Sequence, residues 1–321
     1  MSRYIAQRAI AFIPTLIGIS ILIFAAIRLV PGDQITAQLG TEAGMLTEAQ
    51  RLSLEEYYGL DTPAVEQYFN WLGSAIQGDL GSSVRHGKPV LSLIFERFPL
   101  TVELAFLSVI IGLLIGVPIG ILSAVRHNSF IDLFGRVFSM LGLAVPNFLL
   151  GTMIIYVLSV YFGILPNSGD YVSFFEDPVR NLGQLIFPAI AMGFSFSASV
   201  MRMTRSAMLE ILNEDYVRTA RSKGLKESVV VRRHALRNAL IPVVTLIGIE
   251  FGYLLGGAFI VEYIFTLPGI GRLAVNAISQ REYALVQGVT LFIAVNFVII
   301  NLIVDLVYVT LDPRISYADK N

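Results

Sequence analysis

The chain has no cysteine among its 321 residues, and only 15% of its residues are charged. The missing cysteines exclude disulfide bonds, thiolate zinc sites and thiol catalysis. With 55% hydrophobic residues and a mean hydropathy of +0.70, the chain is too apolar for an ordinary soluble domain. A net charge of −1 also argues against a nucleic-acid-binding protein. These values indicate an integral membrane protein.

Recognisable catalytic patterns are also missing. The three histidines, His86, His127 and His234, lie far apart, and none belongs to an H-E-x-x-H zinc-binding pattern. The segment 81–89 comes closest to a phosphate-binding loop, but it has five residues between its glycines where four are needed, and Pro89 stands where Ser or Thr would bind magnesium. We therefore expect no enzyme, no catalytic residue, no metal site and no bound cofactor, so that any ATP and magnesium must bind to another subunit.

Long apolar runs bounded by charged residues dominate what is present. A membrane-spanning helix needs about 20 such residues. The first run is better explained as a retained helix than as a signal peptide, because its 19 residues exceed a typical signal core and no small-residue cleavage site precedes Pro31. The six runs are 9–27, 104–125, 137–169 with its helix ending near Tyr161, 181–201, about 238–261, and 283–304. The sequence predicts an all-α integral membrane protein with six transmembrane helices.

The positions of Lys and Arg orient these helices, because cytoplasmic loops retain an excess of positive charge. With the N-terminus inside, the inner segments hold 15 basic residues and the outer segments hold seven, apart from Arg28 at the end of the first run. Four of those seven lie in the segment 31–98, which is long enough to count weakly. Both termini are therefore expected to be cytoplasmic.

Glycine and proline recur within the runs. Glycines at four-residue spacing form a stripe in the second run and another in the fifth, and such stripes let helix backbones approach closely. We expect helix packing at the stripes, with the lining of a conduit as the alternative, and kinks or first helical turns at the prolines. The glycines are Gly112, Gly116, Gly120, Gly248, Gly252 and Gly256, and the prolines are Pro14, Pro118, Pro146, Pro188 and Pro242.

Glu250 is the one plainly mid-span ionisable residue of the runs. Ionisable residues inside a membrane commonly mark ion or proton pathways, so an ion-coupled secondary transporter that uses Glu250 is an alternative function. A proton relay usually needs more than one such group, and the sequence lacks the two matching interrupted helices that secondary transporters favour. A polytopic membrane enzyme is a weaker alternative, because the sequence shows no paired carboxylates or nucleophile motif.

The segment 202–238 is the most charged part of the chain, with nine basic and four acidic residues. Apolar residues at steps of three and four predict an amphipathic helix over 209–223. Gly224 then ends that helix in a left-handed conformation, and a helical pattern resumes over 229–239. Two helices joined by a glycine turn form a rigid knob on the inner face, and a loop lying against anionic lipid headgroups is the alternative.

The sequence DYVRTARSKG at 215–224 resembles the EAA motif of ABC importer permeases, in the form found in the dipeptide/oligopeptide/nickel family. The general motif falls on Arg218, Thr219, Ala220, Gly224, His234, Leu236 and Arg237, of which Ala220, Gly224 and Leu236 match it. The departures are shared by the peptide branch of the family. Further matching segments are PGD at 31–33, GLD at 59–61, QY at 67–68, WL at 71–72, GDLG at 78–81, RSAM at 205–208, RNAL at 237–240, PGIG at 268–271 and LDPR at 311–314.

This resemblance, which runs nearly end to end, identifies the chain as a B-type permease subunit of that family. It implies a type I ABC importer permease fold, in which the first helix flanks a five-helix core. The expected layout is an N-terminal flanking helix at 1–30, an extracytoplasmic segment at 31–98, the permease core at 99–311 with the cytoplasmic coupling loop 202–238, and a cytoplasmic tail at 312–321.

The resemblance also implies partners. The chain would be a multi-pass protein of a bacterial or archaeal cytoplasmic (inner) membrane and would form half of the translocation pathway for peptides or similar small solutes. A C-type permease would form the other half, two ATPase subunits would bind ATP and magnesium, and an extracytoplasmic substrate-binding protein would deliver the substrate. Membrane lipid surrounds such a chain, and no nucleic acid is expected. Peptides are the default substrate, while nickel chelates, glutathione and oligosaccharides stay open.

Two sets of site residues follow. The resemblance assigns the first set to the ATPase-coupling loop, and the second set consists of polar residues on the expected core helices that either line the substrate pathway or join helices by hydrogen bonds. The coupling residues are Glu214, Asp215, Tyr216, Arg218, Thr219, Ala220, Arg221, Lys223 and Gly224. The pathway candidates are Asn147, Ser195, Ser199, Thr245, Glu250 and Asn296. An amphipathic helix with Tyr68, Phe69 and Trp71 is expected to pack on the membrane domain, with contact to the binding protein as the alternative.

Overall fold

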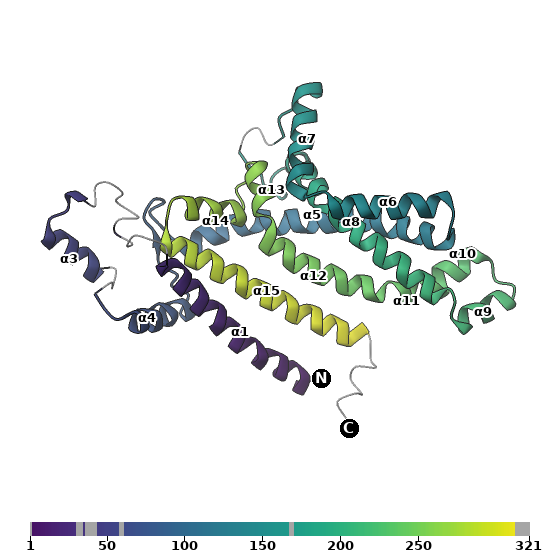
Figure 1. The fold of residues 1–321 in the computed structure, drawn as a ribbon, viewed down its shortest axis with the longest axis horizontal. Helices are drawn as coiled ribbons and strands as arrows, with labels where there is room; N and C mark the ends of the chain where they lie inside the picture. Colours follow the sequence, from purple (N-terminus) through teal and green to yellow (C-terminus); the bar gives the residue numbers. More distant parts are fainter. Residues whose placement is uncertain (1, 30–34, 36–43, 58–60, 167–169, 312–321) are drawn as a thin grey trace. The chain divides into compact units, whose positions relative to one another are not determined.

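The computed structural model describes residues 2–29, 35, 44–57, 61–166 and 170–311, and these residues are mainly helical. They divide into two compact units. Unit 1 contains the described residues of 1–101 and 268–299, and unit 2 contains those of 102–267 and 300–321. Two long helices, α5 (Val90–Val125) and α15 (Tyr283–Leu311), contribute residues to both units (Figure 1).

Within the part of the chain that the structure describes, four helices are long and apolar enough to cross a membrane, and two bent helix pairs raise the number to six if each pair is one span. The four are found in α1 (Ser2–Arg28), α5, α8 (Pro178–Ile211) and α15. The bent pairs are α6 (Phe130–Ala144) with α7 (Asn147–Phe162), and Glu227–Ala239 with Ile241–Leu255. Each apolar run found in the sequence falls on one of these helices or pairs.

The third run is not the single helix that the sequence predicted. Helix α6 ends at Ala144, helix α7 begins at Asn147, and the two helices meet at an angle of 97°. Pro146 has no N–H to continue the helix, and it forces the preceding residue out of the helical region. Val145 accordingly has φ −84° and ψ 118°. Helix α7 ends at Phe162, close to the predicted end at Tyr161, and is followed by Gly163 with φ +65°.

The second span begins earlier than its apolar run. Two short antiparallel strands, β1 (Ser82–Ser83) and β2 (Lys88–Pro89), form a hairpin directly before helix α5, and they are a small addition to the predicted all-helical fold. The Val90 N–H donates to the Gly81 carbonyl oxygen at 2.9 Å. Glu96 does not interrupt the helix, because its exposed carboxylate pairs with Lys88 Nζ at 2.7 Å. The run 104–125 is therefore the C-terminal part of a longer helix.

Helix α8 is the centre of unit 2. It contacts α6, α7, α11 (Leu236–Ala239), α12 (Ile241–Gly257) and α13 (Phe259–Ile264). The fully buried residues of helix α6 are all small or polar, Phe138 is half-buried against Phe194 of α8 at 5.3 Å between ring centroids, and most of its other large apolar residues are exposed. The inward residues of α6 are Asp132, Gly135, Ser139 and Gly142.

The first glycine stripe brings α5 against α8, as predicted for packing. A Cβ atom on Gly112 would lie 2.3 Å from the Phe196 ring, and one on Gly116 would lie 2.5 Å from the Ser197 carbonyl oxygen. A Cβ on Gly120 would lie 2.7 Å from Thr204. These distances are too short for any side chain, so the approach of the two helices requires glycine.

The second stripe shows the same packing at one of its glycines. A Cβ atom on Gly248 of α12 would lie 2.2 Å from the Val304 side chain of α15.

Unit 1 has its own apolar core. The beginning of α5, helix α14 (Ile270–Ser279) and the beginning of α15 meet there. Its buried residues are Val90, Leu93, Ile94, Ile270, Leu273, Ala274, Ala277, Leu285 and Val289. Helix α3 (Glu48–Tyr57) belongs to the same unit.

Helix α4 (Ala64–Ile76) is the amphipathic helix that the sequence predicts within 31–98, and it packs on α1. The Phe24 ring lies 5.3 Å from Tyr68 and 5.9 Å from Trp71 between centroids. The Tyr68 hydroxyl is 2.9 Å from Ser20 Oγ. Phe69 is exposed. The prediction that this helix packs on the membrane domain is thus confirmed for Tyr68 and Trp71.

We expect Gly116→Ala to destabilise the protein by about 1–3 kcal/mol, because the added methyl group overlaps the Ser197 carbonyl oxygen. Gly183→Ala in α8 is the matched control, since a Cβ at Gly183 has no neighbour within 4 Å. That change should be neutral or stabilising by up to about 1 kcal/mol. The measurement is the thermal unfolding midpoint of the purified protein in detergent, and equal midpoints for the two variants would contradict the close packing of α5 on α8.

Candidate functional site

The charged loop begins with a turn rather than with the amphipathic helix predicted over 209–223. Helix α8 continues through Ile211, and a separate helix α9 spans Asp215–Ser222. Between them the Asn213 N–H donates to Glu210 O, and the Asn213 side-chain amide donates to Leu209 O at 2.9 Å. Glu214 is extended, with φ −67° and ψ 146°, and occupies the N-cap position of α9. These bonds end α8 and start a new helix in a different direction.

One face of α9 is buried against the helix that follows it. Val217 and Ala220 pack against Val230, and the partly buried Ile211 and Leu212 complete this cluster. On the edge of the face, the Tyr216 hydroxyl accepts a hydrogen bond of 2.8 Å from Asn238 Nδ2. These contacts fix the orientation of the short helix.

The other face of α9 is exposed. The Arg218 guanidinium lies 3.5 Å from the Asp215 carboxylate, and Thr219 Oγ1 donates to Asp215 O within the helix. Lys223 is also exposed and forms no ion pair with a described residue. A charged face with few internal bonds is available to bind a partner.

Gly224 ends α9 with φ +76°, which confirms the predicted left-handed conformation. A Cβ at this position would meet nothing within 4 Å, so the requirement for glycine is conformational rather than steric. Beyond the turn, Arg221 binds Glu227 at 2.8 and 3.1 Å and donates to Leu212 O. The hydrogen bonds to Glu227 raise the pKa of the Arg221 guanidinium, which stays charged.

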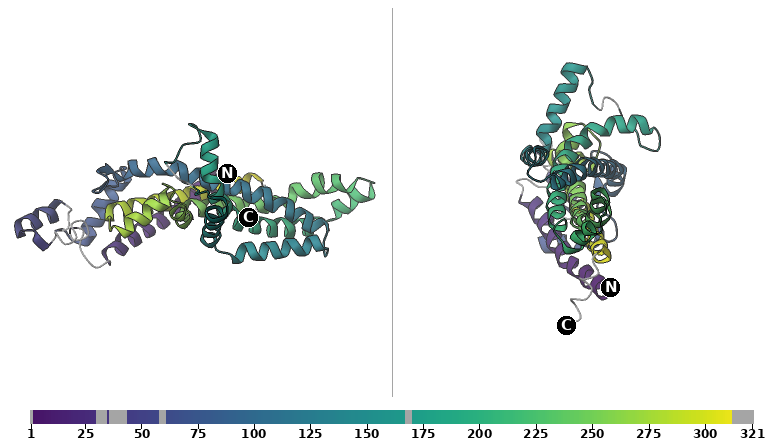
Figure 2. Two further views of the ribbon diagram at one scale, coloured as in Figure 1. Left: turned by 90° about the horizontal axis from the view of Figure 1, so that it is seen from above. Right: turned by 90° about the vertical axis from the view of Figure 1, so that its right-hand side faces the viewer.

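The helix after the turn includes a π-helical segment. It consists of α10 (Glu227–Val229), the π-helix η2 (Val230–Ala235) and α11, and a bend of 46° separates it from α12. Figure 1 shows α9 and α10 beyond the turn that joins α5 to α6, at one end of unit 2, and the left view of Figure 2 agrees. The predicted pair of helices joined by a glycine turn is therefore present and projects from the unit.

Two of the pathway candidates lie at one cavity. Asn147 and Ser195 line a space of about 300 Å³ at the break between α6 and α7, together with the apolar residues of α6, α7, α8, α12 and α13. Tyr253 supplies a third polar group to the lining. The cavity could accept a small solute with few polar groups.

The remaining candidates do not line this cavity. Ser199, Thr245 and Glu250 lie elsewhere in unit 2, and Thr245 Oγ1 is buried without a hydrogen-bond partner among the described residues. Asn296 belongs to unit 1, and its side chain donates to the Phe292 carbonyl of its own helix at 2.8 Å. Among the described residues, no group of three or more His, Asp or Glu side chains could hold a metal ion.

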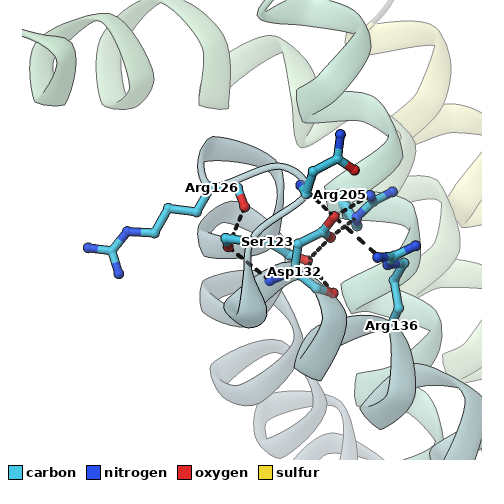
Figure 3. Close-up of polar contacts among 7 residues, drawn as sticks. Ser123, Arg126, Asp132, Arg136 and Arg205 are labelled. Atoms are coloured by element: carbon cyan, nitrogen blue, oxygen red, sulfur yellow. Dashed lines mark hydrogen bonds and ion pairs between the residues drawn. The ribbon is translucent and has the colours of Figure 1, made fainter.

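A buried ion pair between α6 and the end of α8 was not found from the sequence. The Asp132 side chain is 0% exposed, and both of its oxygens bind Arg205, at 2.6 and 3.0 Å. Ser123 Oγ donates to Asp132 at 2.6 Å, and the Asn128 N–H donates at 3.1 Å. Figure 3 shows this cluster, with Arg136 at its edge 3.8 Å from Asp132. The Arg126 side chain points away from it.

This cluster joins the α5–α6 turn to α8, only ten positions before α9 begins. The spacing Ser129-x-x-Asp132 at the start of an apolar run is a capping-box pattern and was a usable signal. Ser129 indeed accepts from the Asp132 N–H, but the Asp132 carboxylate also reaches Arg205. Nothing in the sequence pairs two residues that are 73 positions apart.

Comparison with known proteins gives matches over the whole chain. A family model described as the binding-protein-dependent transport system inner membrane component matches residues 116–317, and a model for the N-terminal part of such components matches residues 1–105. The oligopeptide transport system permease protein AppB of Bacillus subtilis is 43% identical over 99% of this chain and 100% of its own length. A glutathione transport system permease protein, GsiC of Escherichia coli K12, is 37% identical over 99% of this chain and 100% of its own length.

A solved structure has the same fold. The inward-facing MetNI methionine ABC transporter superimposes with a TM-score of 0.53 at 18% identity, and the match covers 68% of this chain and 96% of that chain. This likeness establishes the type I ABC importer permease fold.

The fold and the helices that can span a membrane define a multi-pass permease subunit of an ATP-driven importer. The chain belongs to the family of binding-protein-dependent transport system inner membrane components. Members are membrane subunits without catalytic activity of their own, and they work with a separate ATPase and a substrate-binding protein. None of these findings supports the ion-coupled alternative with Glu250.

We expect Asp132→Ala to destabilise the protein by about 3–5 kcal/mol, because it leaves the Arg205 charge without its buried partner. The double change Asp132→Leu with Arg205→Met removes both charges and should cost less than Asp132→Ala alone. Arg136→Ala, at a half-exposed position, should cost less than about 1 kcal/mol. The unfolding of the three variants in detergent tests this order of stability. A double variant that is less stable than Asp132→Ala would disprove the pairing.

Proposed function

We propose that this chain is the B-type permease of a peptide importer. The support is the name and full-length similarity of its relatives, which are described as oligopeptide, peptide and glutathione permeases. Glutathione is itself a small peptide, so short peptides are the substrate class common to these names. A C-type permease completes the pathway, and two ATPase subunits bind ATP and magnesium on the cytoplasmic side.

The proposed topology places both termini in the cytoplasm, as the excess of Lys and Arg in 202–237 favours. The flanking helix is then 1–30, the extracytoplasmic segment 31–98, the permease core 99–311 and the cytoplasmic tail 312–321. In this arrangement the projecting helix α9 lies inside the cell, on the side where ATP is available.

Helix α9 and its glycine turn form the ATPase-coupling element, with the residues Glu214, Asp215, Tyr216, Arg218, Thr219, Ala220, Arg221, Lys223 and Gly224. The observation that carries this proposal is the division of α9 into a buried face and an exposed charged face. The exposed face is free to bind an ATPase, and the buried face transmits displacement to Val230 and the helix beyond it. A loop that lay on lipid headgroups would not need this internal packing.

Movement of the coupling element reaches the core along two connections. Val217 and Arg221 connect α9 to the helix that leads into α12, through Val230 and Glu227. Helix α8 leads directly to α9, and the Asp132–Arg205 pair fixes the α5–α6 turn to α8. Closure of the ATPases then moves several core helices together and exchanges outward for inward access.

The substrate pathway includes the cavity at the α6–α7 break. Asn147 and Ser195 supply hydrogen-bonding groups there among apolar neighbours. Ser199, Thr245 and Glu250 are further candidates on α8 and α12, and Asn296 is the weakest because its amide is bonded to its own helix.

Single cysteines at Ser222 and Gln77 should react from opposite sides of an intact membrane, because the proposed topology places one inside and the other outside. The native chain contains no cysteine, so each label reports one position. An impermeant thiol reagent applied from one side, before and after permeabilisation, makes the measurement. Labelling of both positions from the same side would refute the topology.

Gly224→Val should reach the membrane in normal amount but lose most uptake, because valine adopts the φ of +76° only with strain of about 1–3 kcal/mol. The displaced α9 would bind the ATPases poorly or leave ATP hydrolysis unlinked to transport. Membrane content, ATPase co-purification and uptake should be measured in the same membranes.

Gly183→Val is the control for a glycine-to-valine change outside the loop, and charge reversal at Arg218 and Arg221 tests the exposed face. A lipid-bound loop would respond to the charge reversal and hardly to Gly224→Val. Normal uptake with normal ATPase retention in Gly224→Val would remove the coupling role from this loop.

A further inference from the structure

Unit 1 contains a small polar cavity beside helix α14. Its volume is about 210 Å³, and the β1–β2 hairpin, the first turns of α5, helix α14 and the start of α15 surround it. The lining residues that matter for binding are His86, Arg97, Arg272, Asn276 and Gln280. None of these residues belongs to the coupling loop or to the proposed substrate pathway.

The charge of this cavity is one-sided. Two guanidinium groups, from Arg97 and Arg272, and the His86 imidazole line it, and none of the described lining residues carries a carboxylate. Arg97 forms no salt bridge with a described residue. The guanidinium of Arg97 has no carboxylate beside it among the described lining residues, and its positive charge in a concave space raises the local potential, so an anion is stabilised there. The side-chain amides of Asn276 and Gln280 can add hydrogen bonds to it.

Two carboxylates of the described residues lie near these cations without lining the cavity. Glu96 pairs with Lys88 at 2.7 Å, and Arg97 and His86 also attract its charge. The other carboxylate is Glu282. It is buried and accepts a hydrogen bond of 2.5 Å from Ser83 Oγ, and Arg85 lies 3.7 Å from its second oxygen. His86 Nδ1 lies 4.0 Å from that oxygen and 2.9 Å from Ser83 Oγ. Glu282 therefore fixes the hairpin that carries His86, but it does not line the cavity.

We infer that this cavity receives a carboxylate side chain of the extracytoplasmic substrate-binding protein. The inference rests on the proposed function, because it is the proposed topology that places His86, Arg97 and Arg272 outside the cell. The volume is below the 300 Å³ or more that is usual for small-molecule sites, and it suits the tip of an Asp or Glu side chain better than a peptide. An arginine commonly binds a carboxylate through two parallel hydrogen bonds, and this geometry would fix the position of a docked protein.

The test uses the complete importer in lipid nanodiscs and measures the Kd of its binding protein for wild type and variants. Arg97→Gln should weaken binding about tenfold or more and reduce its dependence on salt. Arg97→Lys, which keeps the charge, should lose less. His86→Glu, at an exposed hairpin position, places a negative charge in the cavity and should also weaken binding about tenfold.

Lys88→Gln is the matched control, because Lys88 lies on the same hairpin as His86, is exposed, and does not line the cavity. It should change the Kd less than about twofold. Normal ATP hydrolysis by each variant complex shows that the permease has folded and assembled. High concentrations of binding protein should restore uptake in Arg97→Gln.

An unchanged Kd in both Arg97→Gln and His86→Glu would overturn the inference, and so would an equal loss in Lys88→Gln. A normal Kd combined with slower uptake of free-carboxyl peptides, but not of their amides, would assign the cavity to the substrate instead. A wild-type importer that fails to take up peptides with its binding protein would contradict the proposed function. Normal uptake by the wild type, combined with an unchanged Kd in the variants, contradicts only the inference about the cavity and leaves the proposed function in place.

Discussion

The close approach of helices α5 and α6 to α8 is the constraint on which unit 2 depends. Lipid tails are as apolar as the side chains they meet, so helices in a membrane associate by close packing and hydrogen bonds rather than by exclusion of water. Gly112 and Gly116 let α5 lie against α8, and Gly135 and Gly142 do the same for α6. A larger side chain at any of these positions would separate the helices and take Arg205 out of reach of Asp132.

Because the helices are so close, the buried charge pair can act as a mechanical connection. Asp132 is held by a backbone N–H, a hydroxyl and a guanidinium, so its carboxylate has little freedom to move. Both oxygens of Asp132 bind the same arginine, so the hydrogen bonds fix the orientation of the carboxylate relative to the guanidinium as well as the distance between them. The end of α8 and the α5–α6 turn therefore behave as one rigid piece, and α9 is attached to that piece through a turn of three residues.

Features set by local chemistry were predictable from the sequence, and features set by tertiary contact were not. Apolar composition gave the membrane helices, and the need for positive φ gave the end of α9 at Gly224. Pro146 was compatible with a kink or with a helix start. The 97° angle between α6 and α7 depends on the helices that surround the break, which the sequence does not reveal. The end of α8 at Ile211 depends on Asn213, whose side chain competes for backbone carbonyls. The Asp132–Arg205 pair joins residues 73 positions apart, which no sequence pattern relates. The faces of the polar pathway residues depend on neighbours that periodicity does not reveal.

The break between α6 and α7 also has a consequence for how the chain meets the bilayer. Helix α7 has 16 residues and is about 24 Å long, which is shorter than the roughly 30 Å of hydrocarbon that a straight helix must cross. Neither leg is long enough to cross alone, so in a single span formed by the pair the irregular backbone at Val145 and Pro146 would lie at a depth where lipid offers no hydrogen bonds. Such backbone is stable in a membrane only where protein or water surrounds it. In such a span, the residues of α8, α12 and α13 that line the cavity beside Pro146 and Asn147 would supply that protein surrounding.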